Sequence, residues 1–358
     1  MHIQVIWVYN LDHKNLSIIL YMKKKQILII NTGGTISCIQ SSTGFAPQAG
    51  FVKQALQNMP ELQHPQMPHY QLIEYTNLID SSNITLDDWN TIASDIAKHY
   101  NQFDGFIILH GTDTLAYTSS ALSFMLENIA KPVIITGAQI PLSELRSDGK
   151  ENIITSLYLA QSEELHEVCV FFNQKLLRGN RAQKVSAYEF SAFDSPNLPP
   201  LAIAGVQIKW QDNLRLDKPS KPFNLQLLQQ HYIANFRLFP SFSTNVLKHL
   251  LTQPLKGLVL ETYGSGNAQD NDPEFIKILN DASKREVIII NCSQCHHGKV
   301  NMSTYATGNM LQKAGVISAY NMTAEAAHCK LLYLLSKNLT PPEIKHAFNQ
   351  PICGEYSS

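Results

Sequence analysis

Short segments that are apolar on both faces alternate with segments of helical spacing along this chain of 358 residues. Such apolar segments suit parallel strands buried between helices, because these strands have no face left for water. In the first half, the expected strands are 27–30, 106–109, 133–135 and 168–172, and the expected helices are 86–100, 114–129 and 149–161. The alternation predicts an α/β fold with a parallel sheet.

A proline-rich stretch interrupts this pattern, with prolines at positions 196, 199, 200 and 219. The alternation resumes with strands expected at 258–260, 287–290 and 316–317, and with helices at 273–283, at 304–313 and after Thr323 and Thr340. We therefore expect a larger N-terminal parallel-sheet α/β domain at 22–205, a linker at 206–225 and a smaller C-terminal α/β domain at 226–358. Residues 1–21 lack the features of a signal peptide, and Met22 begins a lysine run typical of a translation start. We expect them to be a non-native or disordered extension.

The composition narrows the class of function. With 44% hydrophobic and 16% charged residues, the chain can bury a large core. Its formal charge of -1 gives no general attraction to nucleic acids or anionic membranes, and no apolar segment reaches the roughly 18–20 residues of a membrane span. The six cysteines of so long a chain are expected to be free thiols in a reducing compartment, which points to the cytoplasm. A small neutral or zwitterionic substrate fits best.

Polar motifs follow two of the expected strands. Thr32-Gly33-Gly34-Thr35 follows the strand at 27–30, and His110-Gly111-Thr112-Asp113-Thr114 follows the strand at 106–109. Ligands of open α/β sheets bind at the carboxyl ends of the strands, so neighbouring strands would bring both motifs to one site. The paired glycines would let backbone N–H groups approach an oxyanion, although a tight turn capped by threonine would also explain the first motif. Phosphate binding is not expected, since the sequence has neither GxGxxG nor GK[ST].

A threonine hydroxyl needs a nearby base before it can act as a nucleophile. Asp113 could transfer protons and position an ammonium group, but an aspartate before a helix is also a common N-cap. A lysine acts as a base only when it is neutral, which desolvation favours, so Lys184 is a candidate. By itself, Lys184 is one of three nearby basic residues that could all lie on a solvated loop.

Together, these motifs resemble those of bacterial type I (cytoplasmic) L-asparaginases. The similar segments, which agree in order and spacing, are 32–36, 80–82, 110–114, 136–139, 145–148, 178–181, 196–200, 263–267 and 305–309. The resemblance extends from about Met22 to near the C-terminus. It implies two α/β domains, a site at the carboxyl edge of the larger sheet, L-asparagine as substrate and a homodimer or homotetramer. It implies neither a metal nor an organic cofactor.

The resemblance also implies roles for individual residues. Thr32 matches the family's nucleophile, which forms a β-aspartyl ester and releases ammonia before water restores the enzyme. Thr112, Asp113 and Lys184 match the second hydroxyl, the carboxylate and the lysine of its proton relay. Ser81 and Asp113 match the groups that hold the substrate's α-carboxylate and α-ammonium. Thr112 also matches a substrate contact, and its backbone N–H would stabilise the oxyanion.

Two positions depart from the family pattern. Phe45 stands where many members carry a tyrosine whose hydroxyl assists proton transfer, so Thr35, Thr112 or a water would replace it, or activity would be reduced. Glu261 follows a strand at a position where type I enzymes often have a basic residue. A second, regulatory asparagine site in this region therefore does not follow from the resemblance.

Other interpretations remain for parts of the sequence. Cys292-Ser293-Gln294-Cys295-His296 matches a haem-attachment pattern, but haem attachment needs export and a structural zinc site usually needs a second Cys or His pair, so we expect neither. One rival function is the amidase component of a tRNA transamidation system, which carries an additional nucleic-acid-handling domain before its asparaginase domains. The other rival is a catalytically weak sensor that binds asparagine or aspartate, suggested by Phe45.

Overall fold

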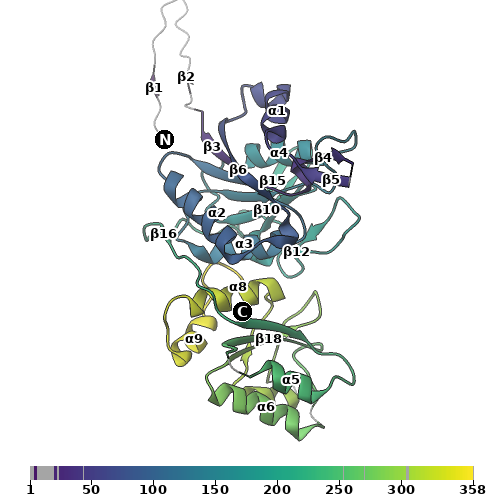
Figure 1. Cartoon of the computed structure of the whole chain (residues 1–358). Coiled ribbons are helices and arrows are strands. Elements are labelled where there is room, and N and C mark those ends of the chain that lie inside the picture. The colour runs from purple at the N-terminus through teal and green to yellow at the C-terminus, as the bar shows by residue number, and fades with distance from the viewer. Residues whose placement is uncertain are drawn as a thin grey trace, which may run out of the picture.

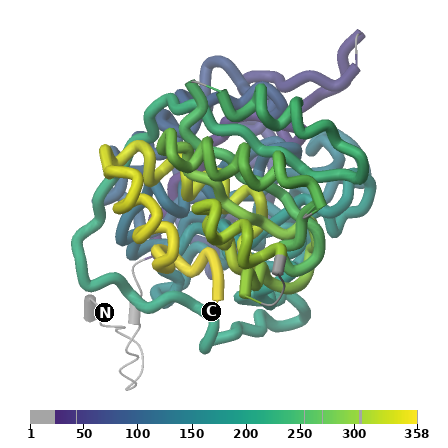
Figure 2. Tube along the Cα trace, turned by 90° about the horizontal axis from the view of Figure 1, so that it is seen from below, coloured from purple at the N-terminus to yellow at the C-terminus, as the bar shows by residue number. Residues whose placement is uncertain are grey.

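The computed structural model describes residues 4–5, 20–21, 24–42, 44–252, 254–269, 271–303 and 306–357. Two domains lie one above the other in Figure 1, with the N-terminal one at the top. Seen from below, the green and yellow C-terminal domain lies in front of the blue part of the larger domain (Figure 2). The expected α/β fold with a larger N-terminal and a smaller C-terminal domain is confirmed.

The larger domain contains a mixed sheet of eight strands in the order β15-β14-β11-β10-β9-β7-β3-β6. Five neighbouring strands are parallel: β3 (Gln26–Gly33), β6 (His69–Ile79), β7 (Gly105–Leu109), β9 (Val133–Thr136) and β10 (Val168–Phe172). Three antiparallel strands extend the other side: β11 (Lys175–Arg178), β14 (Ala202–Ala204) and β15 (Ile208–Trp210). Both polar motifs follow strands of the parallel part.

Alternate residues of the parallel strands pack on opposite faces of the sheet. Leu28 and Ile30 of β3 belong to the core that includes α2 (Leu86–His99) and α3 (Leu115–Met125). Ile27 and Ile29 belong to a second core that includes α1 (Phe51–Gln57) and α4 (Gly149–Leu159). Helices therefore cover both faces, which is the environment that apolar parallel strands require.

Local sequence determines where α2 begins but does not determine where α3 ends. α2 begins after Thr85, whose side chain accepts the N–H of Asp88 while the Asp88 carboxylate accepts the N–H of Thr85. The helix expected at 114–129 stops at Met125, so this prediction was too long. The next residues, Leu126–Glu127 (β8), instead pair with Asn224–Leu225 (β16).

The smaller domain contains four parallel strands: β17 (Ile233–Arg237), β18 (Gly257–Thr262), β19 (Ile288–Ser293) and β20 (Ile317–Ser318). On one face, α5 (Thr244–Leu250), α6 (Pro273–Lys284) and α7 (Ala306–Lys313) enclose a separate core. On the other face lie α8 (Ala324–Leu335) and α9 (Pro341–Phe348), which join the core of α2 and α3. One core therefore continues from domain to domain.

The boundary between the domains stays a prediction. Within the expected linker at 206–225, β15 pairs with β14 and β16 pairs with β8, so both ends of this segment are held by strand pairing. Of residues 1–21, only β1 (Gln4–Val5) and β2 (Leu20–Tyr21) are described, and they pair with each other. The remainder of the expectation for 1–21 lies outside the described residues. In the described part of the chain, no helix is long and apolar enough to cross a membrane.

Candidate active site

The two polar motifs meet because β3 and β7 are hydrogen-bonded neighbours, with Asn31 beside Leu109. Their loops touch: a Cβ added at Gly34 would lie 2.2 Å from the backbone nitrogen of Gly111. Gly34 also has a φ of 78°, which side chains rarely adopt. The expectation that both motifs lie at the same edge of the sheet is confirmed.

Lys184 reaches this edge from a separate two-stranded ribbon, β12 (Gln183–Lys184) paired with β13 (Phe193–Asp194). Its Nζ donates to Thr112 Oγ1 at 2.9 Å and to Asp113 Oδ1 at 2.6 Å. The lysine side chain is 20% exposed, whereas that of Asp113 is 63% exposed. Three of the four predicted catalytic residues therefore form one hydrogen-bonded group with an ion pair at its outer side.

Thr32, the fourth residue, is buried at the end of the neighbouring strand. Its hydroxyl donates to the backbone carbonyl of Leu109 at 2.8 Å, and not to Thr112, Asp113 or Lys184. This bond uses the hydroxyl proton, so the oxygen keeps its lone pairs for other partners. The structure places Thr32 on the strand next to the loop of the lysine group, without a direct hydrogen bond to it.

Ser81 begins the short helix η3 (Ser81–Asn83) after β6 and is buried against the second motif. Thr114 Oγ1 donates to the Ser81 carbonyl at 2.7 Å, and a Cβ at Gly111 would lie 2.5 Å from Ser81 Oγ. The N-cap position of α3 is Thr114, and its side chain makes no capping bond. Asp113 forms an ion pair with Lys184 and is not the N-cap of α3, so the alternative interpretation of Asp113 as a helix cap is wrong.

Two buried residues that support the loops, Asn31 and His110, were given no role by the sequence analysis. Asn31 Oδ1 accepts the N–H of Gly33 and the hydroxyl of Ser37, and its amide nitrogen donates to Glu74. An asparagine at the end of an otherwise apolar strand was the available signal. It holds the turn that carries Thr32 in one conformation.

His110 is the second supporting residue, and its ring is buried in the loop that carries Thr112. Its Nε2 lies 3.0 Å from Thr118 Oγ1, which accepts a hydrogen bond from Trp89 Nε1. Burial lowers the pKa of His110 from 6.5 to about 4, so the ring is neutral near pH 7. This histidine ties the loop to α2 and α3.

Comparison with known proteins agrees with this arrangement. The family model for the asparaginase N-terminal domain matches residues 26–216, and that for the glutaminase/asparaginase C-terminal domain matches residues 233–348. The chain is a type I member of the asparaginase family. It is 48% identical to L-asparaginase 1 of Escherichia coli (strain K12) over 339 residues, which cover 93% of this chain and 98% of that protein.

Two solved structures are similar over almost their whole length. The crystal structure of L-asparaginase I from Vibrio cholerae has a TM-score of 0.88 and 47% identity, covering 94% of this chain and all of that one. The L-asparaginase from Thermococcus kodakarensis has a TM-score of 0.85 and 30% identity, covering 93% of this chain and 99% of that one. The fold of this asparaginase therefore matches both.

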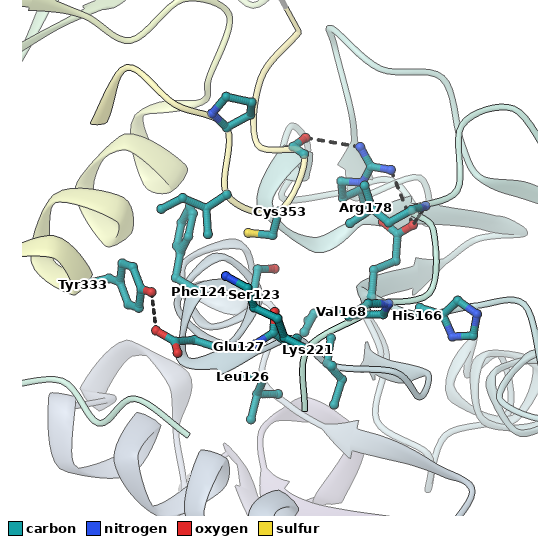
Figure 3. Close-up of a pocket in the computed structure, with 18 of the residues that line it drawn as sticks. Ser123, Phe124, Leu126, Glu127, His166, Val168, Arg178, Lys221, Tyr333 and Cys353 are labelled. Atoms are coloured by element: carbon teal, nitrogen blue, oxygen red, sulfur yellow. Dashed lines mark hydrogen bonds and ion pairs between the residues drawn. The ribbon is translucent and has the colours of Figure 1, made fainter. Parts of the chain in front are cut away.

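The positions that depart from the family pattern lie outside the lysine group. Phe45 lies in the hairpin of β4 (Cys38–Ser41) and β5 (Gly44–Pro47), where its side chain is 50% exposed. Glu261 lies 3.4 Å from Arg237 and lines a small cavity together with Gln183 and Cys295. A larger cavity of about 620 Å³, shown in Figure 3, has none of the predicted site residues in its lining.

The cysteines of the haem-like pattern occupy different environments. Cys292 is buried in β19, and this burial raises the pKa of its thiol to about 12, whereas Cys295 is exposed. His296 lies 2.9 Å from Gln183 Oε1, and His297 lies 2.8 Å from the carbonyl of Pro196. The Nδ1 atoms of both histidines therefore contact residues of the larger domain.

Proposed function

We propose that this protein hydrolyses L-asparagine to L-aspartate and ammonia, with the Thr32 hydroxyl as nucleophile. The observation that carries the proposal is the hydrogen-bonded group of Lys184, Thr112 and Asp113 on the loop next to Thr32. The identity of 48% to an L-asparaginase 1 over 93% of the chain supports the same activity and substrate.

The geometry suggests how the hydroxyls divide the work. Because Thr112 Oγ1 accepts from Lys184, the proton of Thr112 is free to point toward a bound amide. For the reaction, the Thr32 hydroxyl must turn from the Leu109 carbonyl toward this group. Thr32 then attacks the amide carbon, its proton passes through the group to the leaving nitrogen, and the C–N bond breaks to give ammonia and a β-aspartyl ester. Water then adds to the ester carbon, the C–O bond to Thr32 Oγ1 breaks to release L-aspartate, and one proton of the water restores the Thr32 hydroxyl.

The same residues would hold the rest of the substrate. Ser81 would donate to the α-carboxylate, and the Asp113 carboxylate would accept from the α-ammonium. The large exposed fraction of Asp113 supports this role, since one of its oxygens pairs with Lys184 and the other is accessible. A carboxylate shared between two cations of this kind fixes the substrate's orientation as well as its charge.

We also propose that the protein acts in the cytoplasm as a homodimer or homotetramer. Support for assembly comes from large apolar side chains that are almost fully exposed in one chain, such as Leu145, Tyr188 and Val206. Light scattering on the purified protein should give two or four times the 40.2 kDa of one chain.

The test of the activity is ammonia release from L-asparagine by the unmodified protein, by Thr32→Ala and by Thr91→Ala. Thr91 is an exposed threonine of α2, so its variant controls for the loss of a hydroxyl. We expect the protein and Thr91→Ala to react at the same rate and Thr32→Ala to be slower by about 1000-fold or more. Equal rates for all three would exclude Thr32 as the nucleophile.

The second candidate, a sensor that binds asparagine without turning it over, is favoured by one observation. Phe45 has no hydroxyl at the position where many relatives have a tyrosine. Binding of L-asparagine by calorimetry with no ammonia release from the unmodified protein would support the sensor.

A further inference from the structure

Three side chains of residues 178–181 hold the C-terminal segment, which we define as residues 352–356. Asn180 Nδ2 donates to the Cys353 carbonyl at 3.0 Å, Arg178 Nη1 to the Gly354 carbonyl at 3.2 Å and Arg181 Nη1 to the Glu355 carbonyl at 2.7 Å. Figure 3 shows Arg178 reaching across to the chain that carries Cys353. Three successive carbonyls are therefore bound by one short stretch of the larger domain.

A fully buried ion pair between Lys330 of α8 and Glu355 also fixes the C-terminal segment. Lys330 Nζ also donates to the carbonyls of Phe348 and Gln350, which uses all three of its protons. The Glu355 carboxylate in turn accepts the backbone N–H groups of Ile352 and Cys353. A buried charge network in which every group is satisfied allows one arrangement of the chain and disfavours others.

Residues 178–181 lead directly into the strand that carries Lys184. The short helix η4 (Gly179–Arg181) is followed by Ala182 and then by β12, which pairs with β13 and not with the eight-stranded sheet. On its inner side, the Gly179 carbonyl accepts from Ser119 Oγ of α3 at 2.7 Å. The position of Lys184 thus depends on how η4 is held between α3 and the C-terminal segment.

We propose that the C-terminal segment is a positioning element for the reaction, acting through η4 to hold Lys184 against Thr112 and Asp113. This inference rests on the proposed function of Lys184. Among the described residues, no hydrogen bond or ion pair joins the segment to Lys184, Thr112 or Asp113, so its effect is on the lysine's position and not on the chemistry itself. A C-terminus placed in the smaller domain would in this way control a proton-transfer residue of the larger one.

Gly354 offers a specific way to disturb the contact. It has a φ of 74°, and a Cβ there would lie 2.4 Å from Arg178 Nη1. Because Arg178 is also held by the Glu167 carboxylate and the Leu214 carbonyl, it cannot simply turn away, and Gly354→Ala should push the C-terminal segment from it. Gly264→Ala is the matched control, because Gly264 also has a positive φ, of 50°, but a Cβ there would meet nothing within 4 Å.

The first test is a double-mutant cycle with Gly354→Ala and Lys184→Met, measured as kcat and KM for L-asparagine. We expect Gly354→Ala to lower kcat by about tenfold or more and to change KM less than about threefold, while Gly264→Ala changes neither. In the Lys184→Met background, Gly354→Ala should change kcat by less than about twofold, because the residue it positions is gone. An equal loss of kcat in both backgrounds would overturn the proposal, since the segment would then act on the whole fold.

The second test does not depend on activity. Hydrogen exchange followed by mass spectrometry should show faster exchange in peptides covering 179–194 of Gly354→Ala, with α2 unchanged and with Gly264→Ala like the original protein. Exchange in 179–194 that stays the same, or that rises equally in α2, would count against a positioning role.

If Gly354→Ala does not fold, Asn180→Ala removes one hydrogen bond to the C-terminal segment and serves in both tests. If the protein did not hydrolyse asparagine but showed the expected exchange, the proposed function would be refuted. The effect of the C-terminal segment on the position of residues 179–194 would still hold.

Discussion

Thr32 and Thr112 are buried threonines at the ends of neighbouring strands, yet their hydrogen bonds give them different properties. The Thr32 hydroxyl donates a hydrogen bond to the Leu109 carbonyl, whereas the Thr112 hydroxyl accepts a hydrogen bond from Lys184 Nζ. A hydroxyl has one proton and two lone pairs, so the first presents lone pairs and the second presents a proton. This difference favours Thr32 as the attacking atom and Thr112 as the proton donor.

His110, directly before this loop, makes the stability of the protein depend on pH. The unfolded chain binds a proton at this residue below about pH 6.5, whereas the folded chain does so only near pH 4. The stabilisation is therefore complete above pH 6.5 and decreases as the pH falls toward 4. His110→Gln removes this titration, so the difference in unfolding free energy between pH 7 and pH 4.5 should shrink by about 2–3 kcal/mol. Urea unfolding at both pH values measures it, and an unchanged difference would contradict the assignment.

At the scale of the elements, the close approach of the loops after β3 and β7 can be tested at Gly34. Gly34→Ala combines an unfavourable φ with a Cβ only 2.2 Å from Gly111, and should cost about 2–5 kcal/mol of unfolding free energy. Gly44→Ala shares the positive φ, but its Cβ would meet nothing within 4 Å, so its cost should be about 1–2 kcal/mol. Urea unfolding of both variants measures the difference, and equal costs would show that the loops can separate freely.

The elements also show how far the sequence alone could predict the fold. β7 and β10 are buried along their whole length, and continuous apolar runs predicted them. β6 was missed, although it is the longest strand of the sheet, because it lies at the edge, has no fully buried residue and shows no regular alternation of exposed and half-buried residues. α3 was predicted too long, since the pairing of Leu126–Glu127 with a segment almost 100 residues away leaves no local signal.

The residues of the candidate site also divide into those that the sequence pattern predicted and those that it did not. The strand-end rule placed Thr32, Thr112 and Asp113 at one edge, because adjacent parallel strands end together. Lys184 lies 72 residues after Thr112 on a ribbon outside the main sheet, so only the family resemblance could associate it with them. The role of Asn31 was not predicted, since its partners become neighbours only after the turn has formed.

For the whole molecule, the core shared by α3 and α8 predicts that both domains unfold together. Phe124 of α3 is buried against Tyr333 of α8, with ring centroids 5.8 Å apart. Phe124→Ala should cost about 3–5 kcal/mol and lower the urea midpoints of both domains equally. With Trp7 replaced by phenylalanine, tryptophan fluorescence reports on the larger domain through Trp89 and Trp210. Labelling of the buried Cys292 thiol, followed in its own peptide by mass spectrometry, reports on the smaller domain. Phe239→Ala, at a half-exposed position whose ring contacts the edge of the core at Phe242, should move both midpoints much less. If Phe124→Ala moved the fluorescence midpoint alone, the shared core would not couple the two domains. The hydrogen bonds between the C-terminal segment and residues 178–181 would then be the remaining link to Lys184.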